Sequence, residues 1–148
     1  MRALLQRVLA GSVTVDGAVT GCIGPGLVVF LGVGLGDTEA DADYLAHRIA
    51  GLRVFAQGES AFDRSVTDVG GAILVVSQFT LMADTTRGRR PSFTDAAPPD
   101  LARLLYERFV ADLRDAGLTV ATGMFQQHMH VEIHNDGPVT LLLESRRR

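Results

Sequence analysis

The sequence predicts a mixed α and β domain with hairpins at both ends and two helices between them. Its 148 residues are 47% hydrophobic and 21% charged, which is typical of a globular chain that buries a sizeable core. Short apolar or alternating segments near both ends suit strands, whereas two segments between them repeat apolar residues at helical spacing. No internal repeat or linker divides the chain, so we expect residues 1–148 to form one domain.

The first third is expected to be rich in strands. Residues 12–15 alternate polar and apolar side chains before the Asp-Gly pair at 16–17, a strong hairpin signal, and residues 18–23 supply the partner strand. The apolar run over 27–33 suits a strand buried on both faces. Thr38 then caps a predicted helix whose apolar face is formed by Ala42, Leu45, Ala46, Ile49 and Leu52.

The second half is predicted to hold one more helix among strands. Residues 70–81 suit a central strand that runs into a special loop, and residues 83–98 form one long loop of a kind that is usually functional or disordered. The helix begins at Pro98–Pro99 and ends at Gly117, a suitable C-terminal stop. Its predicted core stripe is Leu101, Leu104, Leu105, Phe109 and Leu113, and the last strands are predicted at 118–122, 128–134 and 138–144.

Charge and cysteine content narrow the possible environments and partners. The net charge of −3 provides no global field toward nucleic acid, so such a contact would need a local basic patch. The single cysteine, Cys22, cannot form an internal disulfide, which fits a cytoplasmic location. Gln6 and Arg7 interrupt the apolar N-terminus too early for a signal peptide, and no apolar run reaches the length of a membrane span.

Two further patterns suggest ligands but have simpler explanations. The Gly-x-Gly-x-Gly spacing of residues 31–37 departs from a dinucleotide loop, and acidic residues crowd the helix start that a phosphate would need. His128, His130, Glu132 and His134 share one face of a strand, which could bind metal or simply meet solvent or another subunit. Metal sites usually draw ligands from several elements, so we predict neither a metal nor another cofactor.

Two polar segments are candidates for substrate contact. Ser77 and Thr80 flank Gln78 where the central strand ends; they either satisfy nearby backbone or present hydroxyls, an amide and backbone N–H groups to a ligand. Three arginines, Arg87, Arg89 and Arg90, stand in the long loop before Phe93, where they form either a solvated surface or a phosphate-binding patch. The arginine-rich tail at 145–148 could add charge to such a patch or be a disordered end.

The last predicted strand is interrupted by Gly137 and Pro138. Proline has no N–H for a sheet ladder and glycine weakens a strand interior, so the pair marks either a plain turn or edge, or rigid backbone kept for contact with something else. Several motifs, in order along nearly the whole chain, resemble the D-aminoacyl-tRNA deacylase family: VVSQFTL at 75–81, GRRPSF at 88–93, AAPP at 96–99 and NDGPVT at 135–140.

The resemblance implies a homodimeric editing enzyme with a three-layer β/β/α fold that hydrolyses the ester between a D-amino acid and tRNA. Its active site would lie at the dimer interface, where Ser77, Gln78, Phe79 and Thr80 of one subunit meet Gly137 and Pro138 of the other. The family's Gly-Pro bond is cis, and such a backbone template would bind the α-amino group and leave no room for an L side chain. Glycine would pass this filter, which implies glycyl-tRNA(Ala) as a second substrate.

The resemblance also implies how other residues act. Met129 would border the adenosine pocket, although core packing explains it nearly as well, and Asn135 belongs to the substrate-binding motif. Backbone N–H groups around Phe79 and Thr80 would stabilise the oxyanion, while the 2′-hydroxyl of the terminal adenosine helps to activate water. Thr80 as a covalent nucleophile is the alternative mechanism. The competing functions are an RNA-binding module based on the loop arginines and a metal-binding protein based on the histidines.

Overall fold

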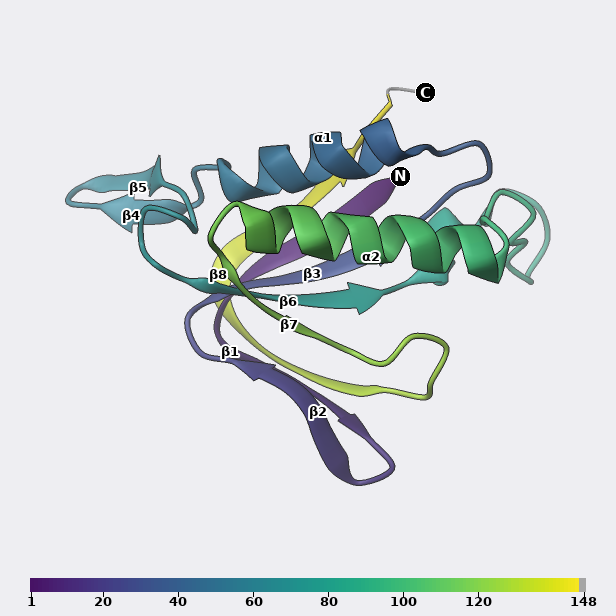
Figure 1. Cartoon of the computed structure of the whole chain (residues 1–148), viewed down its shortest axis with the longest axis horizontal. Coiled ribbons are helices and arrows are strands. Elements are labelled where there is room, and N and C mark those ends of the chain that lie inside the picture. Colours follow the sequence, from purple (N-terminus) through teal and green to yellow (C-terminus); the bar gives the residue numbers. More distant parts are fainter. Residues whose placement is uncertain (147–148) are drawn as a thin grey trace.

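The computed structural model describes residues 1–146, which form three layers: two helices, a central sheet and a second, curved sheet (Figure 1). The two sheet layers are parts of one bent six-stranded sheet. The sheet order is β2-β1-β3-β6-β7, with β8 also paired to β1. The elements are β1 (Arg2–Val15), β2 (Ala18–Ile23), β3 (Gly26–Gly32), α1 (Glu39–Ala50), β4 (Phe55–Gln57), β5 (Ser60–Arg64), β6 (Ala72–Ser77), the 3₁₀ helix η1 (Phe79–Met82), α2 (Pro99–Asp115), β7 (Thr119–Thr122) and β8 (His130–Glu144).

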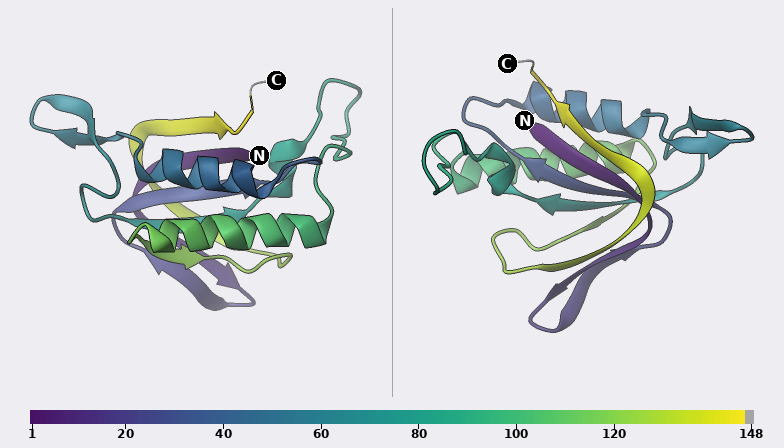
Figure 2. Two further views of the ribbon diagram at one scale, coloured as in Figure 1. Left: turned by 45° about the horizontal axis from the view of Figure 1, so that its top comes forward. Right: turned by 180° about the vertical axis from the view of Figure 1, so that it is seen from behind.

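Two long strands join the sheet layers. The first half of β1 pairs antiparallel with β3 and its second half with β2, while β8 follows β1 over both halves. Both strands bend strongly between the layers, as the rear view in Figure 2 shows. Gly11 lies in the half of β1 that pairs with β2, and an added Cβ there would stand 2.7 Å from Val28 Cγ2 of β3. A larger residue there would therefore force the layers apart.

The fold has two cores because the central sheet is covered on both faces. Apolar side chains of α1 and α2 pack on one face, where Leu45, Phe109 and Leu5 are fully buried. The other core lies between the sheets and contains Val13, Val28 and Leu74 among its buried residues. Continuous burial along β3 and β6 follows from this double cover and explains their uniformly apolar sequences.

The structure confirms the three-layer mixed fold and both predicted helices. Thr38 is the N-cap of α1, and its N–H donates to Asp41 Oδ2 at 2.8 Å, as in a capping box. The predicted core position of Leu104 is wrong: its side chain is 54% exposed because it lies across the helix from the stripe formed by Leu105 and Phe109. Neither helix, within the described chain, has the length and apolarity needed to cross a membrane.

Strand bounds differ from the predicted ones in three places. β1 already begins at Arg2, and the β4–β5 hairpin, which projects at the end of α1 in Figure 1, was not predicted. The expected strands at 128–134 and 138–144 are one strand, β8, because pairing to β1 resumes on both sides of the Gly-Pro interruption. There Asn135 pairs with Val8 and Thr140 with Gln6, so residues 136–139 form a bulge opposite Arg7.

Candidate active site

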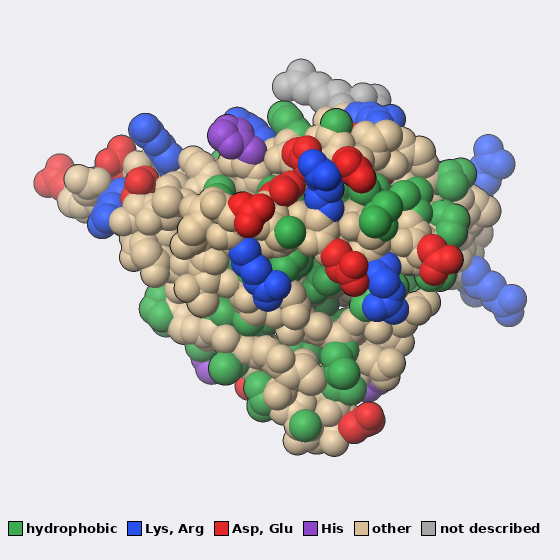
Figure 3. Space-filling model, in the orientation of Figure 1, with side chains coloured by type: hydrophobic (Ala, Val, Ile, Leu, Met, Phe, Trp, Pro, Cys, Tyr) green, Lys and Arg blue, Asp and Glu red, His purple; other side chains and the backbone are tan. Residues whose placement is uncertain are grey.

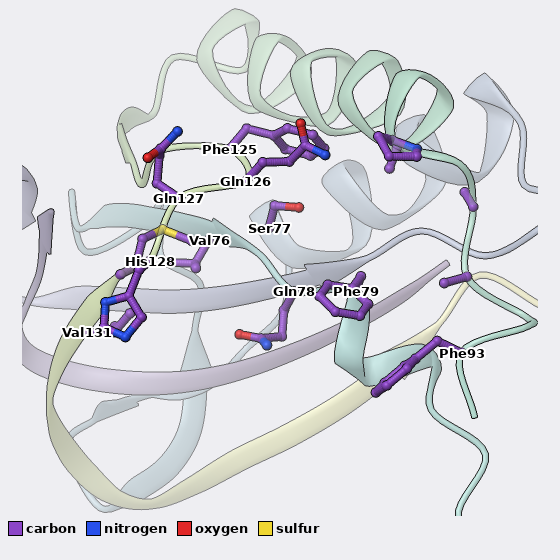
Figure 4. A pocket seen from close by; sticks show the side chains of 15 residues that line it. Val76, Ser77, Gln78, Phe79, Phe93, Phe125, Gln126, Gln127, His128 and Val131 are labelled. Atoms are coloured by element: carbon purple, nitrogen blue, oxygen red, sulfur yellow. The ribbon is translucent and has the colours of Figure 1, made fainter. Parts of the chain in front are cut away.

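A pocket of about 670 Å³ opens where β6 ends (Figure 4). Its walls come from the end of β6, the loop before α2, the start of α2 and the segment that leads into β8. The lining residues are Val76, Ser77, Gln78, Phe79, Phe93, Ala96, Ala97, Pro99, Ala102, Phe125, Gln126, Gln127, His128, Met129 and Val131. The pocket is therefore mostly apolar, with amides, a hydroxyl and one imidazole as its polar side chains.

The geometry after β6 is fixed by its neighbours. The N–H of Gln78 continues the parallel ladder by donating to the carbonyl of Leu31 at 2.8 Å, after which the chain turns into η1. This turn packs over Gly32, where an added Cβ would lie 2.9 Å from Leu81 Cβ. Arg2 donates from β1 to the carbonyl of Leu81 at 2.8 Å. The first strand thus holds the far end of the turn in place.

The structure brings three of the four predicted catalytic residues to the pocket. Ser77, Gln78 and Phe79 line it, whereas Thr80 is exposed outside the lining and its hydroxyl accepts a hydrogen bond from the Gln78 amide. Phe79 and Thr80 begin the 3₁₀ turn, so their N–H groups have no acceptor within that turn. Of these two donors, the N–H of Phe79 belongs to a residue of the pocket lining.

Aromatic rings form much of the wall. Phe79 and Phe93 meet edge to face with centroids 5.1 Å apart, which ties the loop before α2 to the end of β6. On the opposite side, Phe125 lies 6.1 Å from the ring of Tyr106 and carries the guanidinium of Arg103 at 4.5 Å. Phe125 was missed in the sequence because it lies in an irregular segment, where no periodicity marks a residue as part of a wall.

Met129 lies between the pocket and the core, and its predicted place beside adenosine stays a prediction. It lines the pocket and packs against the core between the sheets. Its sulfur lies close to Gly123, where an added Cβ would stand only 2.7 Å away. His128 lines the pocket beside it, whereas His130, Glu132 and His134 are exposed on the outer face of β8. Within residues 1–146, no group of three or more His, Cys, Asp or Glu side chains is placed to hold a metal ion.

The loop arginines are exposed, and the base of their loop is well defined. Backbone hydrogen bonds in both directions join Asp84 and Ser92, and the Asp84 carboxylate accepts from the hydroxyl of Thr86 at 2.7 Å. Hydrogen bonds from Thr86 lower the pKa of Asp84. Among the salt bridges of the described chain, none involves Arg87, Arg89 or Arg90. From the tail, Arg146 pairs with Asp41 at 2.7 Å, and residues 147–148 lie outside the described residues.

The Gly-Pro bulge stands far from the pocket of its own chain. The Gly137–Pro138 bond is cis, both residues are exposed, and neither lines the pocket. The bulge is on β8, three strands away from Ser77 on β6, and its partner Arg7 lies four residues off the register of Ser77, so the bulge and Ser77 are roughly 20 Å apart. A single chain therefore does not bring together the two parts of the site that the sequence predicts.

Internal hydrogen bonds hold the bulge. Arg7 donates to the carbonyl of Val54 at 2.7 Å and to that of Asp136 at 3.1 Å, and it pairs with the Asp136 carboxylate. The Asn135 amide donates to the carbonyls of Arg7 at 2.9 Å and Val139 at 3.2 Å. Asn135, predicted to bind substrate, thus uses its amide to join the bulge to β1.

Comparisons with known proteins agree along the whole chain. The family D-Tyr-tRNA(Tyr) deacylase matches residues 4–144. The D-aminoacyl-tRNA deacylase of Heliobacterium modesticaldum is 65% identical over 99% of this chain and 97% of its own, and that of Roseiflexus castenholzii is 59% identical over 98% and 92%.

Two solved structures share the fold. The c-Myc DNA unwinding element binding protein superposes with a TM-score of 0.93 at 40% identity, covering 99% of this chain and 100% of its own. A probable eukaryotic D-amino acid tRNA deacylase gives 0.85 at 18% identity, over 97% of this chain and 98% of its own. The second likeness concerns the fold alone.

Proposed function

The chain belongs to the D-Tyr-tRNA(Tyr) deacylase family, and on that premise we propose that it hydrolyses the ester bond of D-aminoacyl-tRNA at a site completed by a second copy of the chain. The enzyme class follows from the family, whose curated members that match this chain over nearly its full length are D-aminoacyl-tRNA deacylases. The observation that carries the proposal is the pocket after β6, which presents backbone donors, amides and aromatic rings.

A homodimer is supported by what each chain leaves incomplete. The pocket and the Gly-Pro bulge lie roughly 20 Å apart in one chain, so a second copy must supply the bulge if both act on one substrate. The sheet face away from the helices carries Leu4, Phe30 and Leu142 side by side, and Leu142 is 55% exposed. An apolar row of this kind is suited to burial against its own copy.

The bulge gives a physical basis for selecting D-amino acids. Gly137 and Pro138 offer backbone carbonyls and no polar side chain, so they can bind an α-amino group without reading which amino acid is attached. Placed against the pocket of the partner, this backbone would occupy the space that an L side chain needs. Glycine has no side chain to clash, so glycyl-tRNA(Ala) is a further substrate of the same filter.

The chemistry we propose relies on positioning and on backbone donors. An aminoacyl ester is already reactive, so a placed water and stabilisation of the developing oxyanion account for catalysis. The N–H groups of Phe79 and Thr80 are the donors, because they begin η1 and have no acceptor within it. We propose that the 2′-hydroxyl of the terminal adenosine helps to activate the water, in keeping with a lining that holds no carboxylate and only one imidazole, that of His128.

The decisive experiment compares matched substrates. Purified protein is incubated with D-tyrosyl-tRNA, L-tyrosyl-tRNA and glycyl-tRNA(Ala), and loss of the amino acid is followed together with the oligomeric state. We expect hydrolysis of the D-tyrosyl and glycyl esters by a dimer, with the L-tyrosyl ester left intact. Equal hydrolysis of both tyrosyl esters would contradict the proposed exclusion of L-amino acids by the Gly-Pro backbone. Activity of a monomer would contradict a site built from two copies of the chain.

A further inference from the structure

A second hollow, of about 560 Å³, lies beside the candidate pocket, between α2 and the segment that joins β7 to β8. We call it the α2 groove. Phe125 and Gln127 line both the groove and the pocket, so the two hollows are neighbours with a shared wall. On the helix side, residues 103, 107, 110 and 114 line the groove, and their spacing puts them on one face of α2.

The two arginines of this face have no carboxylate within salt-bridge distance in the part of the chain that the structure describes. Within residues 1–146, neither Arg103 nor Arg114 forms a salt bridge, whereas Arg108 of the same helix pairs with Asp43 at 2.6 Å and Glu39 at 2.9 Å. Arg114 is oriented by one donated bond, to the carbonyl of Val120 at 3.1 Å. Basic and acidic side chains gather over the helix at the front of Figure 3, which is α2.

We propose that the α2 groove binds the phosphate backbone of the single-stranded 3′ end of the tRNA, with Arg103 and Arg114 contacting phosphates. This inference rests on the proposed function, because it requires the terminal adenosine to occupy the neighbouring pocket. The rest of the tRNA chain must then leave that pocket. Because Phe125 forms a wall of both hollows, the groove is the neighbouring space into which the chain can continue. Eleven helical residues separate the arginines by about 16 Å, the length of about five stacked nucleotides.

The remaining groups of the groove fit a nucleotide chain. The guanidinium carbon of Arg103 stands 4.5 Å from the centroid of the Phe125 ring, and the planar guanidinium gives a base a surface on which to stack. Glu107 lies one turn after Arg103 and would repel a phosphate, so the phosphate contacts belong to the two ends of the face. The Glu107 carboxylate, at the middle of the face, can instead accept a hydrogen bond from the N4 amino group of a cytosine.

The test uses two substrates that differ in whether they reach the groove. D-tyrosyl-tRNA fills both hollows, whereas 3′-O-D-tyrosyl-adenosine ends in the pocket. We compare wild type with Arg103→Ala/Arg114→Ala, with the charge-preserving Arg103→Lys/Arg114→Lys, and with Arg48→Ala. Arg48 is an exposed arginine of α1 that forms no salt bridge within residues 1–146. KM, kcat and their dependence on salt are measured for each pair.

In the double alanine variant, KM for D-tyrosyl-tRNA is expected to rise about tenfold more than KM for the adenosine substrate. The salt slope, which is the slope of log KM for the tRNA against log salt concentration, should fall by about 1.5. The lysine variant should recover most of the slope, and Arg48→Ala should match wild type. Equal losses on both substrates would overturn the proposal, because they would indicate a damaged Phe125 wall. An unchanged KM for the tRNA would overturn it as well.

Failure of the proposed function would look different. Wild type inactive on both substrates would reject the deacylase itself, and binding of uncharged tRNA would then test the groove alone. In that measurement, a salt slope shared by wild type and the double alanine variant rejects the groove, whereas a slope reduced by about 1.5 in the variant supports it.

Discussion

Arg7 and Asp136 are joined twice: the guanidinium donates to the Asp136 carbonyl at 3.1 Å and pairs with its carboxylate at 3.0 Å. The Arg7 side chain is only 14% exposed, and its third bond, to the carbonyl of Val54, reaches the segment before β4. One side chain of the first strand therefore fixes the position of the bulge in the last strand.

Arg7→Ala is expected to reduce both stability and activity. Removal of the guanidinium leaves the buried Val54 carbonyl without this donor, which costs about 1–3 kcal/mol in the free energy of unfolding. The bulge loses its anchor, so hydrolysis of D-tyrosyl-tRNA should fall steeply. Urea unfolding and single-turnover hydrolysis measure the two effects. Arg7→Lys should be intermediate, because an ammonium can face Asp136 but lacks the planar fork. Wild-type values for Arg7→Ala would contradict this role.

A matched change at Asn135 separates positioning from substrate binding. Asn135→Asp keeps the shape of the side chain and places a carboxylate oxygen against the two carbonyls that its amide now serves. If Asn135 only shapes the bulge, stability and activity fall together, as they do for Arg7→Ala. A raised KM with unchanged stability would instead assign Asn135 to direct contact with the substrate, as the sequence motif predicts.

The loop arginines are predicted to bind tRNA phosphates. Replacing Arg87, Arg89 and Arg90 with Ala should weaken tRNA binding and reduce its salt slope by roughly one unit for each lost contact. Turnover at saturating substrate should change much less, because these side chains lie outside the pocket lining. Salt titrations of tRNA affinity provide the measurement. An unchanged slope would mean that the cluster is only a solvated surface.

Thr80 distinguishes the two mechanisms. If catalysis depends on the backbone N–H groups and the tRNA 2′-hydroxyl, Thr80→Ala keeps its backbone donor and retains substantial activity. A covalent mechanism would instead lose nearly all turnover with the hydroxyl. The companion substrate is a tRNA ending in 2′-deoxyadenosine with the D-amino acid on the 3′-hydroxyl, on which we expect wild type to fail. A dead Thr80→Ala and an active wild type on the deoxy substrate would reverse the assignment.

Asp41 should make the stability of the protein sensitive to acid. Burial raises the pKa of Asp41, but hydrogen bonds from Arg146 and Thr38 outweigh burial and lower it well below its usual 3.8. A carboxyl whose pKa is depressed by folding contributes stability above its unfolded pKa, and loses this contribution as the pH falls toward the folded value. Asp41→Asn should therefore cost about 1–3 kcal/mol at pH 7, the range for a lost hydrogen bond to a charged group. The difference from wild type should shrink below about pH 4.

Urea unfolding of both proteins at several pH values checks this expectation. Wild type and Asp41→Asn should converge under acid conditions, because the protonated carboxyl no longer pairs with Arg146 or faces the start of α1 as an anion. Asp68→Asn provides a comparison, since the pKa of Asp68 is also lowered, but by hydrogen bonds from Ser65 in the loop between β5 and β6 rather than by Arg146 and Thr38. A difference between wild type and Asp41→Asn that is independent of pH would contradict the assignment.

Periodicity predicted the helices and the central strands because burial directly determines their pattern. The largely buried β3 and β6 appear as apolar runs, and α2 appears as a stripe, although Leu104 proves to lie on the opposite side of the helix. The β4–β5 hairpin lacks such a signal, because most of its side chains are exposed on both faces. Its Gly58 turn alone does not distinguish it from an irregular loop.

The site was less predictable because it depends on contacts between distant segments. Motifs identified Ser77, Gln78, Phe79 and Met129, which the fold brings to one pocket. No local pattern could indicate Phe125, whose place in the wall depends on α2. Nor could a pattern show that Asn135 bonds to the backbone of Arg7, since that contact joins the two ends of the chain.

The separation of the pocket from the bulge has a genetic consequence. In a symmetric dimer, a chain with a defective bulge and a chain with a defective pocket would place both lesions in one site and leave the other site intact. Arg7→Ala and Gln78→Ala are each expected to lose most of their activity alone. When mixed and reassociated, they should complement each other and regain about a quarter of wild-type activity, since half of the dimers would be mixed and each would carry one working site.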